Sequence, residues 1–383
     1  MTTVAVLGGG PAGAFAAERL ARAGFQTLLF DEKLAWEKPC GGGLTHKAYQ
    51  RYPFLVENAA PKVEVREMRI AGPTVGGVAL QLHEPLIIYS RFDLNALLLE
   101  RARAAGAHIE KTRVLALERR SDEWNIRTRS GSAAADFCIV ATGARNPLRD
   151  FGAQWTAADS MCALGYYVPG RQEHVDVQFL PQFQGYIWVF PRCGHLSVGI
   201  CGKRESSQAM RARLHQYMNR RRIPTDGATF YAHLIPGLET PSWKRTRLGG
   251  EGWLAAGDAA GLVDPVTGEG LYYALRSADL AADALISQQP HQVERYRRAL
   301  WREFVADLEY GASIAHRVFL GRFLGGAVPD RMVQFARRSR SFAQIIQELV
   351  SGAQPYIGLR ERLIRTMKIA ALEMALNPFG KQR

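Results

Sequence analysis

The chain has 383 residues, of which 47% are hydrophobic and 22% charged, and its formal net charge is +13. This composition is that of folded globular proteins, so it excludes a wholly disordered chain, and the length allows two or three domains. The basic excess admits an anionic membrane surface, nucleic acid or an anionic substrate as partner, or simply a solvated basic surface.

The cysteines and the apolar segments of the sequence indicate where in the cell the protein is located. The five cysteines are an odd number, and no two have zinc-site spacing, so we expect reduced thiols and no bound metal. The N-terminal segment has no basic start, and its apolar run is too short for a signal peptide. No apolar run reaches 18 residues, so no segment is predicted to span a bilayer. We expect a cytoplasmic protein, with peripheral membrane contact left open.

The first 33 residues predict a strand, a helix and a second strand. Residues 3–7 are an apolar run that leads into glycines, and residues 12–24 carry Ala and Leu at helical spacing up to a glycine. Residues 26–33 are a second apolar run that ends in acids. This βαβ unit implies a parallel sheet.

A GxGxxG motif, made of Gly8, Gly10 and Gly13, lies between this strand and helix. Its glycines permit a tight turn, close approach of a pyrophosphate and close helix packing, while the helix N-terminus offers free N–H groups. Glu32 follows Gly13 by nineteen residues, where a carboxylate can accept both hydroxyls of an adenosine ribose. The sequence therefore predicts a dinucleotide site, and the carboxylate argues against a 2′-phosphate on that nucleotide.

The middle of the chain changes character twice. Residues 91–109 predict an amphipathic helix that leads into a strand, and residues 113–143 predict three strands, the last being a buried run at 137–141. Residues 155–245 predict short aromatic strands of an antiparallel sheet, with one helix near 206–220.

The later part begins with a return to the βα style. The strand 253–256 leads directly into Gly257 and Asp258, where a carboxylate can bind a ribitol hydroxyl. Gly268 and Gly270 then open a helix whose N-terminus can stabilise negative charge on a reduced isoalloxazine ring. Because this motif follows more than 200 residues after the first one, the pattern favours FAD over a simple NAD enzyme.

From about residue 290 onward the sequence predicts helices, with breaks at Pro329 and Pro355. The fold class we expect is α/β: a Rossmann-like FAD-binding domain with a parallel sheet, an inserted, mostly antiparallel β substrate domain, and a C-terminal helical region. The predicted FAD-binding domain comprises residues 1–60, 90–155 and 245–290, the substrate-binding domain residues 61–89 and 156–244, and the helical region residues 291–383.

With these features, residues 1–290 resemble the flavoprotein hydroxylase superfamily, which has the para-hydroxybenzoate hydroxylase fold. The segment beginning RFDLNALLLE is similar to the family helix whose opening arginine, here Arg91, lies near the cofactor. The segment DFCIVATGARNPLR is similar to its second FAD/nicotinamide segment, but Thr142 stands where the hydroxylases usually carry Asp. There is no second GxGxxG, so the resemblance implies that NAD(P)H binds transiently or that another electron donor replaces it.

Within that superfamily three segments resemble the geranylgeranyl reductase family. They are KPCGGGL at 38–44, YIWVFP at 186–191 and DPVTGEGLYYAL at 264–275. The first is similar to a Cys-Gly-Gly segment beside the flavin, the second to a YxWxFP signature and the third to a P-x-x-G-E-G segment.

This resemblance implies a set of site residues. The FAD-binding residues are expected to be Gly8, Gly10, Pro11, Ala12, Gly13, Glu32, Lys33, Cys40, Gly41, Gly42, Arg91, Val114, Gly143, Gly257, Asp258, Gly268, Gly270 and Leu271. Tyr186, Trp188 and Phe190 alternate along one strand, and their rings are expected to line an apolar substrate channel. Cys40 is the candidate catalytic residue, as a proton donor or a packing element near the flavin, and His46 is a second, weaker candidate.

The function implied is reduction of isoprenoid C=C bonds by hydride transfer from N5 of reduced FAD. A monooxygenase or halogenase acting on a small aromatic or carrier-bound substrate is the alternative, because GYIWVFP overlaps the GWxWxIP segment of flavin-dependent halogenases. The expected partner is an isoprenoid lipid or another apolar substrate, with no nucleic acid. The basic C-terminal helices can lie on an anionic bilayer or pack on the body of the protein.

Overall fold

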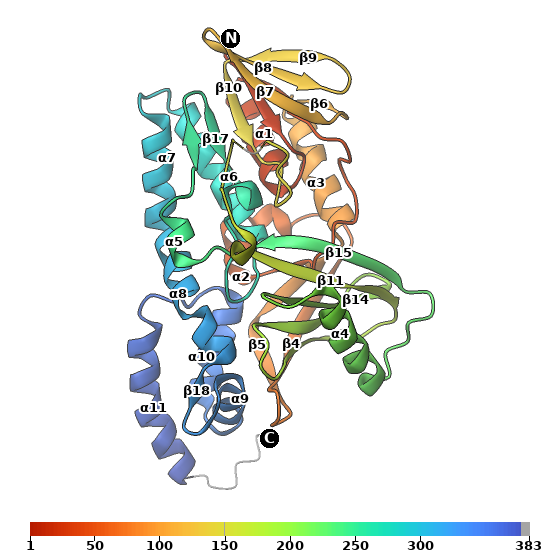
Figure 1. The fold of residues 1–383 in the computed structure, drawn as a ribbon, viewed down its shortest axis with the longest axis vertical. Coiled ribbons are helices and arrows are strands. Elements are labelled where there is room, and N and C mark those ends of the chain that lie inside the picture. Colours follow the sequence, from red (N-terminus) through yellow and green to blue (C-terminus); the bar gives the residue numbers. More distant parts are fainter. Residues whose placement is uncertain (149, 377–383) are drawn as a thin grey trace. The chain divides into compact units, whose positions relative to one another are not determined.

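The computed structural model describes residues 1–148 and 150–376 and divides the chain into two compact units (Figure 1). Unit 1 consists of Met1–Lys38, Arg91–Ser160 and Leu234–Glu309. Unit 2 consists of Pro39–Ser90, Met161–His233 and the chain from Tyr310 onward. The fold class is α/β, as predicted, and each unit is assembled from separate stretches of sequence.

Unit 1 is built on a parallel sheet. In sheet order its strands are β16 (Gly249–Gly250), β17 (Trp253–Ala255), β10 (Phe137–Val140), β1 (Thr3–Leu7), β2 (Gln26–Phe30) and β6 (His108–Glu110). Only the short edge strand β16 pairs antiparallel among these. Val4–Leu7 in β1 are fully buried, as expected of a central parallel strand covered on both faces.

Helices of unit 1 complete its core. Helix α1 (Pro11–Arg22) packs against α3 (Arg91–Ala104) and α6 (Leu271–Ile286). Helix α6 is buried along almost its whole length, because Ala and Leu recur on every side of it. The unit also contains α5 (Thr240–Trp243), α7 (Gln292–Leu300) and a π-helical turn (Trp301–Val305).

The predicted three strands between residues 113 and 143 are four in the structure. Three form a separate small sheet: β7 (Val114–Arg120), β8 (Glu123–Thr128) and β9 (Ser132–Ala135). The fourth, β10, joins the parallel sheet. The switch takes place at Asp136, whose Oδ2 accepts from the Thr3 amide at 2.7 Å while its own amide donates to the Thr3 carbonyl at 3.0 Å.

Unit 2 is built on an eight-stranded, mostly antiparallel sheet. In sheet order its strands are β15 (Thr229–Pro236), β11 (Ser160–Pro169), β14 (His195–Gly202), β13 (Gly185–Pro191), β12 (His174–Phe179), β4 (Lys62–Ala71), β5 (Gly77–Tyr89) and β3 (Gly43–Leu44). Strands β12 and β4 run parallel, so the two halves of the sheet, far apart in sequence, join there.

Two groups of helices cover this sheet. Helix α4 (Ser207–Arg221) packs Met210 and Leu214 onto the β13 face that carries Ile187 and Val189. Helices α9 (Val328–Arg338) and α10 (Arg340–Ser351) pack their apolar faces onto β4 and β5. Other helices and strands of this unit are α2 (His46–Arg51), β18 (Arg322–Phe323), β19 (Gly326–Ala327), α11 (Leu359–Leu376) and most of α8 (Ala306–Leu320), whose first residues belong to unit 1.

Unit boundaries differ from the predicted domain boundaries at several points; residues 234–244 and 291–309, for example, belong to unit 1. Residues 39–60 cluster with unit 2, because β3 pairs with β5. Residues 310–376 also belong to unit 2 rather than forming a region of their own. Pro329 is the second residue of α9 and Pro355 lies between α10 and α11, so both predicted breaks are present.

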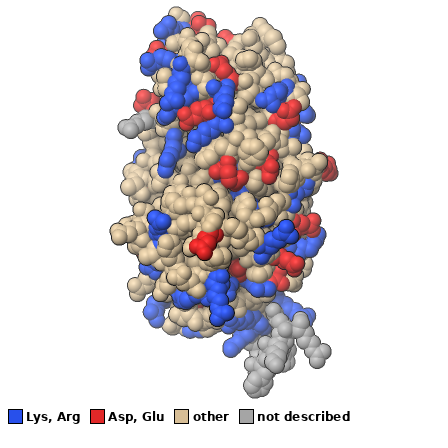
Figure 2. Space-filling model, turned by 90° about the vertical axis from the view of Figure 1, so that its right-hand side faces the viewer, with Lys and Arg blue, Asp and Glu red and all other residues tan. Residues whose placement is uncertain are grey.

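The basic C-terminal region extends to residues 377–383, which lie outside the described residues. In residues 1–148 and 150–376, no helix is both long enough and apolar enough to cross a membrane. Figure 2 shows one face of the molecule, on which Lys and Arg side chains form several separate groups with acidic side chains between them. On this face the positive charge is therefore not gathered into one continuous stripe.

Candidate active site

The turn between β1 and α1 has the three glycines at positions where they are needed. Gly8 has φ +110°, and a Cβ there would lie 2.3 Å from the Ala141 carbonyl oxygen. A Cβ on Gly13 would lie 1.8 Å from the Gly8 carbonyl oxygen. At Gly10 a Cβ would meet no atom of the described chain within 4 Å, so this side of the turn is open to a ligand.

Helix α1 begins at Pro11, directly after this turn. Pro11 occupies the first position, where its missing N–H removes no helical hydrogen bond, and Ala12 and Gly13 follow in the first turn. Within the described chain no side chain caps Gly10, so the first-turn amides and the positive end of the helix dipole face the open side. This arrangement fits a diphosphate.

The two acids after β2 have different roles. Asp31 is held by the backbone, since its carboxylate accepts from the amides of Gly9 at 2.7 Å, Lys33 at 2.7 Å and Leu34 at 2.6 Å. It therefore fixes the glycine turn to the end of β2. Glu32 is instead exposed and available to a ligand. Lys33 is also exposed, with its Nζ 3.9 Å from the centre of the Trp36 ring.

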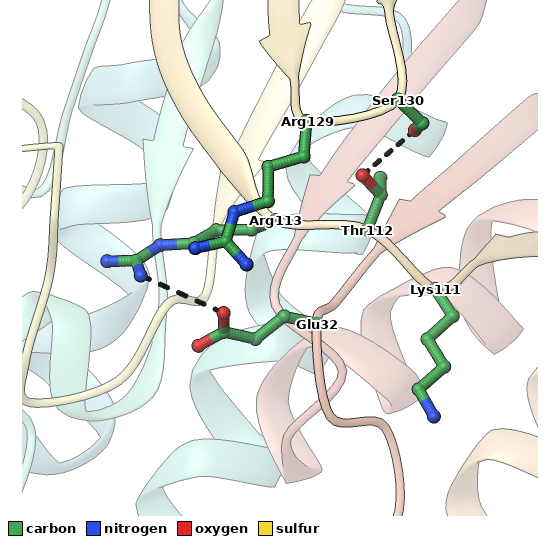
Figure 3. Close-up of a pocket in the computed structure, with 6 residues that line it drawn as sticks. All are labelled: Glu32, Lys111, Thr112, Arg113, Arg129 and Ser130. Atoms are coloured by element: carbon green, nitrogen blue, oxygen red, sulfur yellow. Dashed lines mark hydrogen bonds and ion pairs between the residues drawn. The ribbon is translucent and has the colours of Figure 1, made fainter.

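Glu32 borders a hollow of about 310 Å³ whose lining includes several basic side chains (Figure 3). The other residues lining it are Lys111, Thr112, Arg113, Arg129 and Ser130. Arg113 Nη1 lies 3.9 Å from Glu32 Oε2, and Ser130 Oγ donates to Thr112 Oγ1 at 2.9 Å. Sequence reasoning missed these basic side chains, because they come from the loops before β7 and after β8. Val114, a predicted FAD residue, is the buried first residue of β7.

The second predicted motif lies against the first. Gly257 has φ +62°, and a Cβ on it would lie 3.1 Å from Cβ of Ala12 in α1. Asp258 follows, and its Oδ2 lies 3.0 Å from Lys38 Nζ, with both side chains about one-fifth exposed. Sequence reasoning included Lys38 only as the start of the KPCGGGL segment and did not pair it with Asp258, because the two residues are 220 positions apart.

The loop before α6 is shaped by Asp264. This buried carboxylate accepts from the amides of Val266 at 2.8 Å and Thr267 at 2.9 Å. The Gly268 amide donates to the Asp264 carbonyl at 3.0 Å, and Gly268 has φ +73°. Helix α6 then starts at Leu271 with Gly270 as its N-cap, and no side chain within the described ranges caps it. Its N-terminal amides are thus available to a ligand.

Two more predicted cofactor residues lie in unit 1. Gly143 follows β10 with φ +80°, and among the described residues no atom lies within 4 Å of a Cβ built on it. Arg91 opens α3 and is 3% exposed, with Nη2 3.3 Å from Asn95 Oδ1. Its Nε is buried and has no hydrogen-bond partner in the part of the chain described. A buried, unsatisfied donor is costly, so it fits a site completed by a ligand.

In unit 2, the Cys40–Gly43 segment is packed against the aromatic strand β13. A Cβ on Gly41 would lie 2.8 Å from Phe190 Cδ2, and one on Gly43 would lie 3.1 Å from Phe190 Cε2. Gly42, with φ +83°, donates its amide to Cys40 Sγ at 3.3 Å. The glycines therefore let the Phe190 ring lie directly on this loop.

Aliphatic and aromatic side chains alternate along β13, so its two sides have different surroundings, as the sequence predicts. Ile187 and Val189 pack under α4, while Tyr186, Trp188 and Phe190 occupy the other side. Trp188 is 6% exposed, whereas Tyr186 and Phe190 are only half-buried. The Trp188 ring lies on Gly199, where a Cβ would come within 2.2 Å of it. Trp188 is therefore a packing residue, and its two neighbours are the more accessible rings.

A buried hydrogen-bond network also reaches the Cys40 backbone. Ser197 Oγ donates to the Cys40 carbonyl at 3.1 Å, and Arg192 Nη2 donates to the same oxygen at 2.5 Å. Tyr231 lies 2.9 Å from Ser197 Oγ, and burial raises the pKa of its phenol above the ordinary value. Sequence reasoning missed Ser197, Arg192 and Tyr231.

His46 begins α2 and its ring lies edge-on to Tyr49, with centroids 5.2 Å apart. Thr142, at the position where the resemblance departs from the hydroxylases, donates through Oγ1 to Asn146 Oδ1 at 2.7 Å. No three His, Cys, Asp or Glu side chains of the described chain are grouped as a metal site requires.

Comparison with known proteins finds similarity to oxidoreductases. A family model described as pyridine nucleotide-disulphide oxidoreductase matches residues 2–158. The chloroplastic geranylgeranyl diphosphate reductase of Oryza sativa is 29% identical over 342 residues, covering 80% of this chain and 71% of that protein. The menaquinone reductase of Mycobacterium tuberculosis is 29% identical over 357 residues, covering 83% of each chain.

Solved structures share the fold. A geranylgeranyl bacteriochlorophyll reductase-like protein from Thermoplasma acidophilum has a TM-score of 0.78 at 21% identity, covering 95% of this chain and 99% of that one. The p-nitrophenol 4-monooxygenase of Pseudomonas putida has a TM-score of 0.67 at 18% identity, covering 91% of this chain and 97% of that one. Flavin-dependent halogenases also share this fold, among them a myxobacterial chondrochloren halogenase with a TM-score of 0.62 at 18% identity, covering 81% of this chain and 80% of that one.

The glycine turn, the acid after β2 and the Gly257-Asp258 segment, placed on this fold, define an FAD-dependent oxidoreductase. The protein is therefore an enzyme. Its sequence is similar to those of geranylgeranyl diphosphate reductases, with 29% identity to the Oryza sativa protein and 28% to the Synechocystis protein.

Proposed function

We propose that this enzyme reduces C=C bonds of an isoprenoid chain. The observation that supports this most is the packing of Phe190 on Gly41 and Gly43, because it joins two family-type segments, the Cys-Gly-Gly loop and the YxWxFP strand, in one structural element. The names of the relatives add support, since geranylgeranyl diphosphate reductase acts on an isoprenoid.

The residues of unit 1 fit an FAD molecule. The open side of Gly10 and the first turn of α1 would hold the diphosphate, and Glu32 would accept from the adenosine ribose. Asp258 would bind a ribitol hydroxyl, and the N-terminus of α6 would face the flavin ring. When bound and reduced, FAD supplies a hydride from N5.

The chain's own residues would then place the alkene and supply the proton. An isolated alkene has no carbonyl that can be polarised, so placement and exclusion of water are the main means of catalysis. The half-buried rings of Tyr186 and Phe190 would form the wall of the apolar channel, which gains roughly 0.8 kcal/mol per buried CH₂ group. Cys40 would give its thiol proton to the alkene carbon that does not receive the hydride.

The electron donor and the location belong to the same proposal. NAD(P)H would bind transiently, because the sequence has no second dinucleotide motif. The enzyme would act in the cytoplasm and contact the membrane that holds its lipid substrate. The basic C-terminal region of unit 2 suits such a contact.

Anaerobic turnover tests the reductase proposal. The holoenzyme, reduced with dithionite, is mixed with a geranylgeranyl lipid without oxygen, and the product is analysed by mass spectrometry. We expect the lipid to gain two hydrogens for each reduced bond while the flavin is reoxidised. A product that forms only with oxygen and contains a new oxygen or halogen atom would instead support the monooxygenase or halogenase alternative, whose fold this chain shares.

Cys40→Ser and Phe190→Ala refine this test. Cys40→Ser should lower the reduction rate while FAD content stays at the wild-type level. Phe190→Ala should weaken the use of long prenyl chains more than that of short ones, since longer chains bury more CH₂ groups. If Phe190→Ala affects both chain lengths equally, the ring does not line the channel.

A further inference from the structure

A short hairpin in unit 2 carries exposed apolar side chains. Strands β18 and β19 pair antiparallel around a tip formed by Leu324 and Gly325. Leu324 is 63% exposed, Phe323 39%, and Leu320, just before the hairpin, 37%. Three large apolar residues thus face solvent within five positions of the chain.

The tip is held in a defined conformation. Leu324 has φ +47°, a left-handed backbone that a residue with a Cβ rarely adopts. Arg331 of α9 donates from Nε to the Phe323 carbonyl at 3.2 Å and from Nη2 to the Leu324 carbonyl. Arg322 Nη2 donates to the Gly325 carbonyl at 2.9 Å. A strained conformation with an exposed leucine, fixed by two arginines, suggests a function for the tip.

The surrounding sequence is strongly basic. Residues 310–340 contain six arginines and one acid, Asp330. Asp330 is 6% exposed, and it accepts from the Thr74 amide at 2.9 Å and from the Thr74 hydroxyl at 2.7 Å. The Asp330 carboxylate is therefore buried and bonded within the protein. The charge that residues 310–340 present to solvent is positive. Arginines beside exposed apolar side chains complement a surface with anionic headgroups above hydrocarbon.

The neighbouring helices α9 and α10 have their apolar faces buried in the protein, so these faces cannot contact a bilayer. Val333 and Ala336 of α9 and Phe342 and Ile346 of α10 are buried against β4 and β5. The apolar faces of these two helices are thus already used. This finding redirects the membrane contact expected of α9 and α10 toward the hairpin.

We propose that the tip of the β18–β19 hairpin, Phe323 and Leu324, inserts into the headgroup region of an anionic bilayer, with Arg322 at the phosphate level. This inference rests on the proposed function in one respect: it gives the enzyme access to a substrate dissolved in that bilayer. The binding itself requires no turnover.

Vesicle binding tests the proposal. The holoenzyme is sedimented with phosphatidylcholine vesicles that contain either no anionic lipid or about 30 mol % phosphatidylglycerol. We expect binding to the anionic vesicles, weakened by high salt because the arginine contribution is screened. Leu324→Ser and Phe323→Ser should each reduce the bound fraction about tenfold. Leu115→Ser, at a leucine of β7 that is 45% exposed, is the matched control and should bind as wild type.

Other outcomes overturn the proposal. Equal binding of wild type and Leu324→Ser would exclude the tip as the anchor. Equal binding to neutral and anionic vesicles would contradict the proposed contact with anionic headgroups. If Leu324→Ser changes the molar mass measured by light scattering and leaves vesicle binding unchanged, the tip is instead an interface between copies of this chain. FAD content and thermal unfolding of each variant show that it is folded.

A separate assay keeps this proposal apart from the reductase proposal. Leu324→Ser should turn over a short, water-soluble prenyl substrate at the wild-type rate, because the tip does not take part in the chemistry. Failure of all variants and of wild type to reduce any prenyl substrate would contradict the reductase proposal and would leave the vesicle result standing.

Discussion

Ser197 holds the backbone of Cys40: its hydroxyl donates to the Cys40 carbonyl at 3.1 Å. Ser197 Oγ itself accepts from Trp188 Nε1 at 3.3 Å and lies 2.9 Å from the Tyr231 hydroxyl. A hydroxyl has one donor and two acceptor positions, so these contacts use Ser197 fully when Tyr231 donates to it. Burial raises the pKa of the Tyr231 phenol, which keeps it protonated and able to donate. The aromatic strand and the Cys40 loop are thereby joined through one serine.

Ser197→Ala tests this connection. The change removes one hydrogen bond to Cys40 and also removes the acceptor that Ser197 Oγ offers to the Trp188 N–H and the Tyr231 O–H. We expect the free energy of unfolding to fall by about 1–3 kcal/mol and turnover to fall, with FAD affinity near wild type. Urea denaturation, FAD titration and turnover are measured on the same preparation.

Tyr231→Phe is the matched control for that change. It removes a hydroxyl from the network but leaves the Ser197–Cys40 hydrogen bond in place. Turnover should therefore stay closer to wild type than in Ser197→Ala. If Tyr231→Phe lowers turnover as strongly as Ser197→Ala, the loss follows from general destabilisation and not from the position of Cys40.

The two glycines Gly10 and Gly13 should respond differently to alanine. A Cβ on Gly13 would lie 1.8 Å from the Gly8 carbonyl oxygen, so Gly13→Ala should destabilise the fold by about 3 kcal/mol or more. A Cβ on Gly10 would meet no described atom within 4 Å, and its φ of −71° suits alanine. Gly10→Ala should therefore fold normally and bind FAD at least about tenfold more weakly.

Thermal unfolding of the apoprotein and FAD titration separate these two effects. Gly10→Ala with wild-type FAD affinity would show that the open side of the turn does not hold the diphosphate. Gly13→Ala with wild-type stability would show that α1 can move away from β1.

Local features of the sequence were sufficient to predict the βαβ unit and the two faces of β13. The glycine turn follows from residues within a few positions of each other, and alternation of Ile187 and Val189 with three rings directly gives two faces. The strand count between 113 and 143 was wrong, because local pattern does not show that the chain leaves one sheet for another at Asp136.

Contacts over long sequence distances could not be predicted. Lys38 and Asp258 are 220 positions apart, and Ser197 and Cys40 are 157 apart. Nothing in the composition of either segment identifies its partner, since Lys–Asp and Ser–carbonyl pairs occur throughout proteins. The role of Gly41 and Gly43 was likewise hidden, because it depends on the Phe190 ring that lies on them.

Asp258→Asn and Lys38→Met test the ion pair in the predicted FAD site. Loss of a charged acceptor should weaken FAD binding about tenfold to a hundredfold in Asp258→Asn. If Lys38 acts only through Asp258, the double variant should bind FAD no more weakly than Asp258→Asn alone. Asp122→Asn, at an exposed aspartate of unit 1, is the control and should keep wild-type affinity. Additive losses in the double variant would show that Lys38 contacts the cofactor independently.

The five cysteines offer a test of burial and of stability at high pH. Burial raises the pKa of Cys201 to about 12, whereas Cys193 is exposed. The unfolded chain loses the Cys201 proton near its ordinary pKa of 9.0, but the folded chain keeps it until the raised pKa. Between these two values the folded state binds more protons, so its stability falls as pH rises, by about 1.4 kcal/mol per pH unit for this group.

Cys201→Ala should therefore show a shallower loss of stability above about pH 9 than wild type in urea denaturation, because the titrating thiol is absent. Below that pH the two curves should run parallel. At about pH 8 a maleimide should label Cys193 within minutes and Cys201 only after unfolding, since the thiolate is the reactive form. Rapid labelling of Cys201 in the folded enzyme, read by peptide mass spectrometry, would show that β14 opens locally and that the thiol is not held in the core.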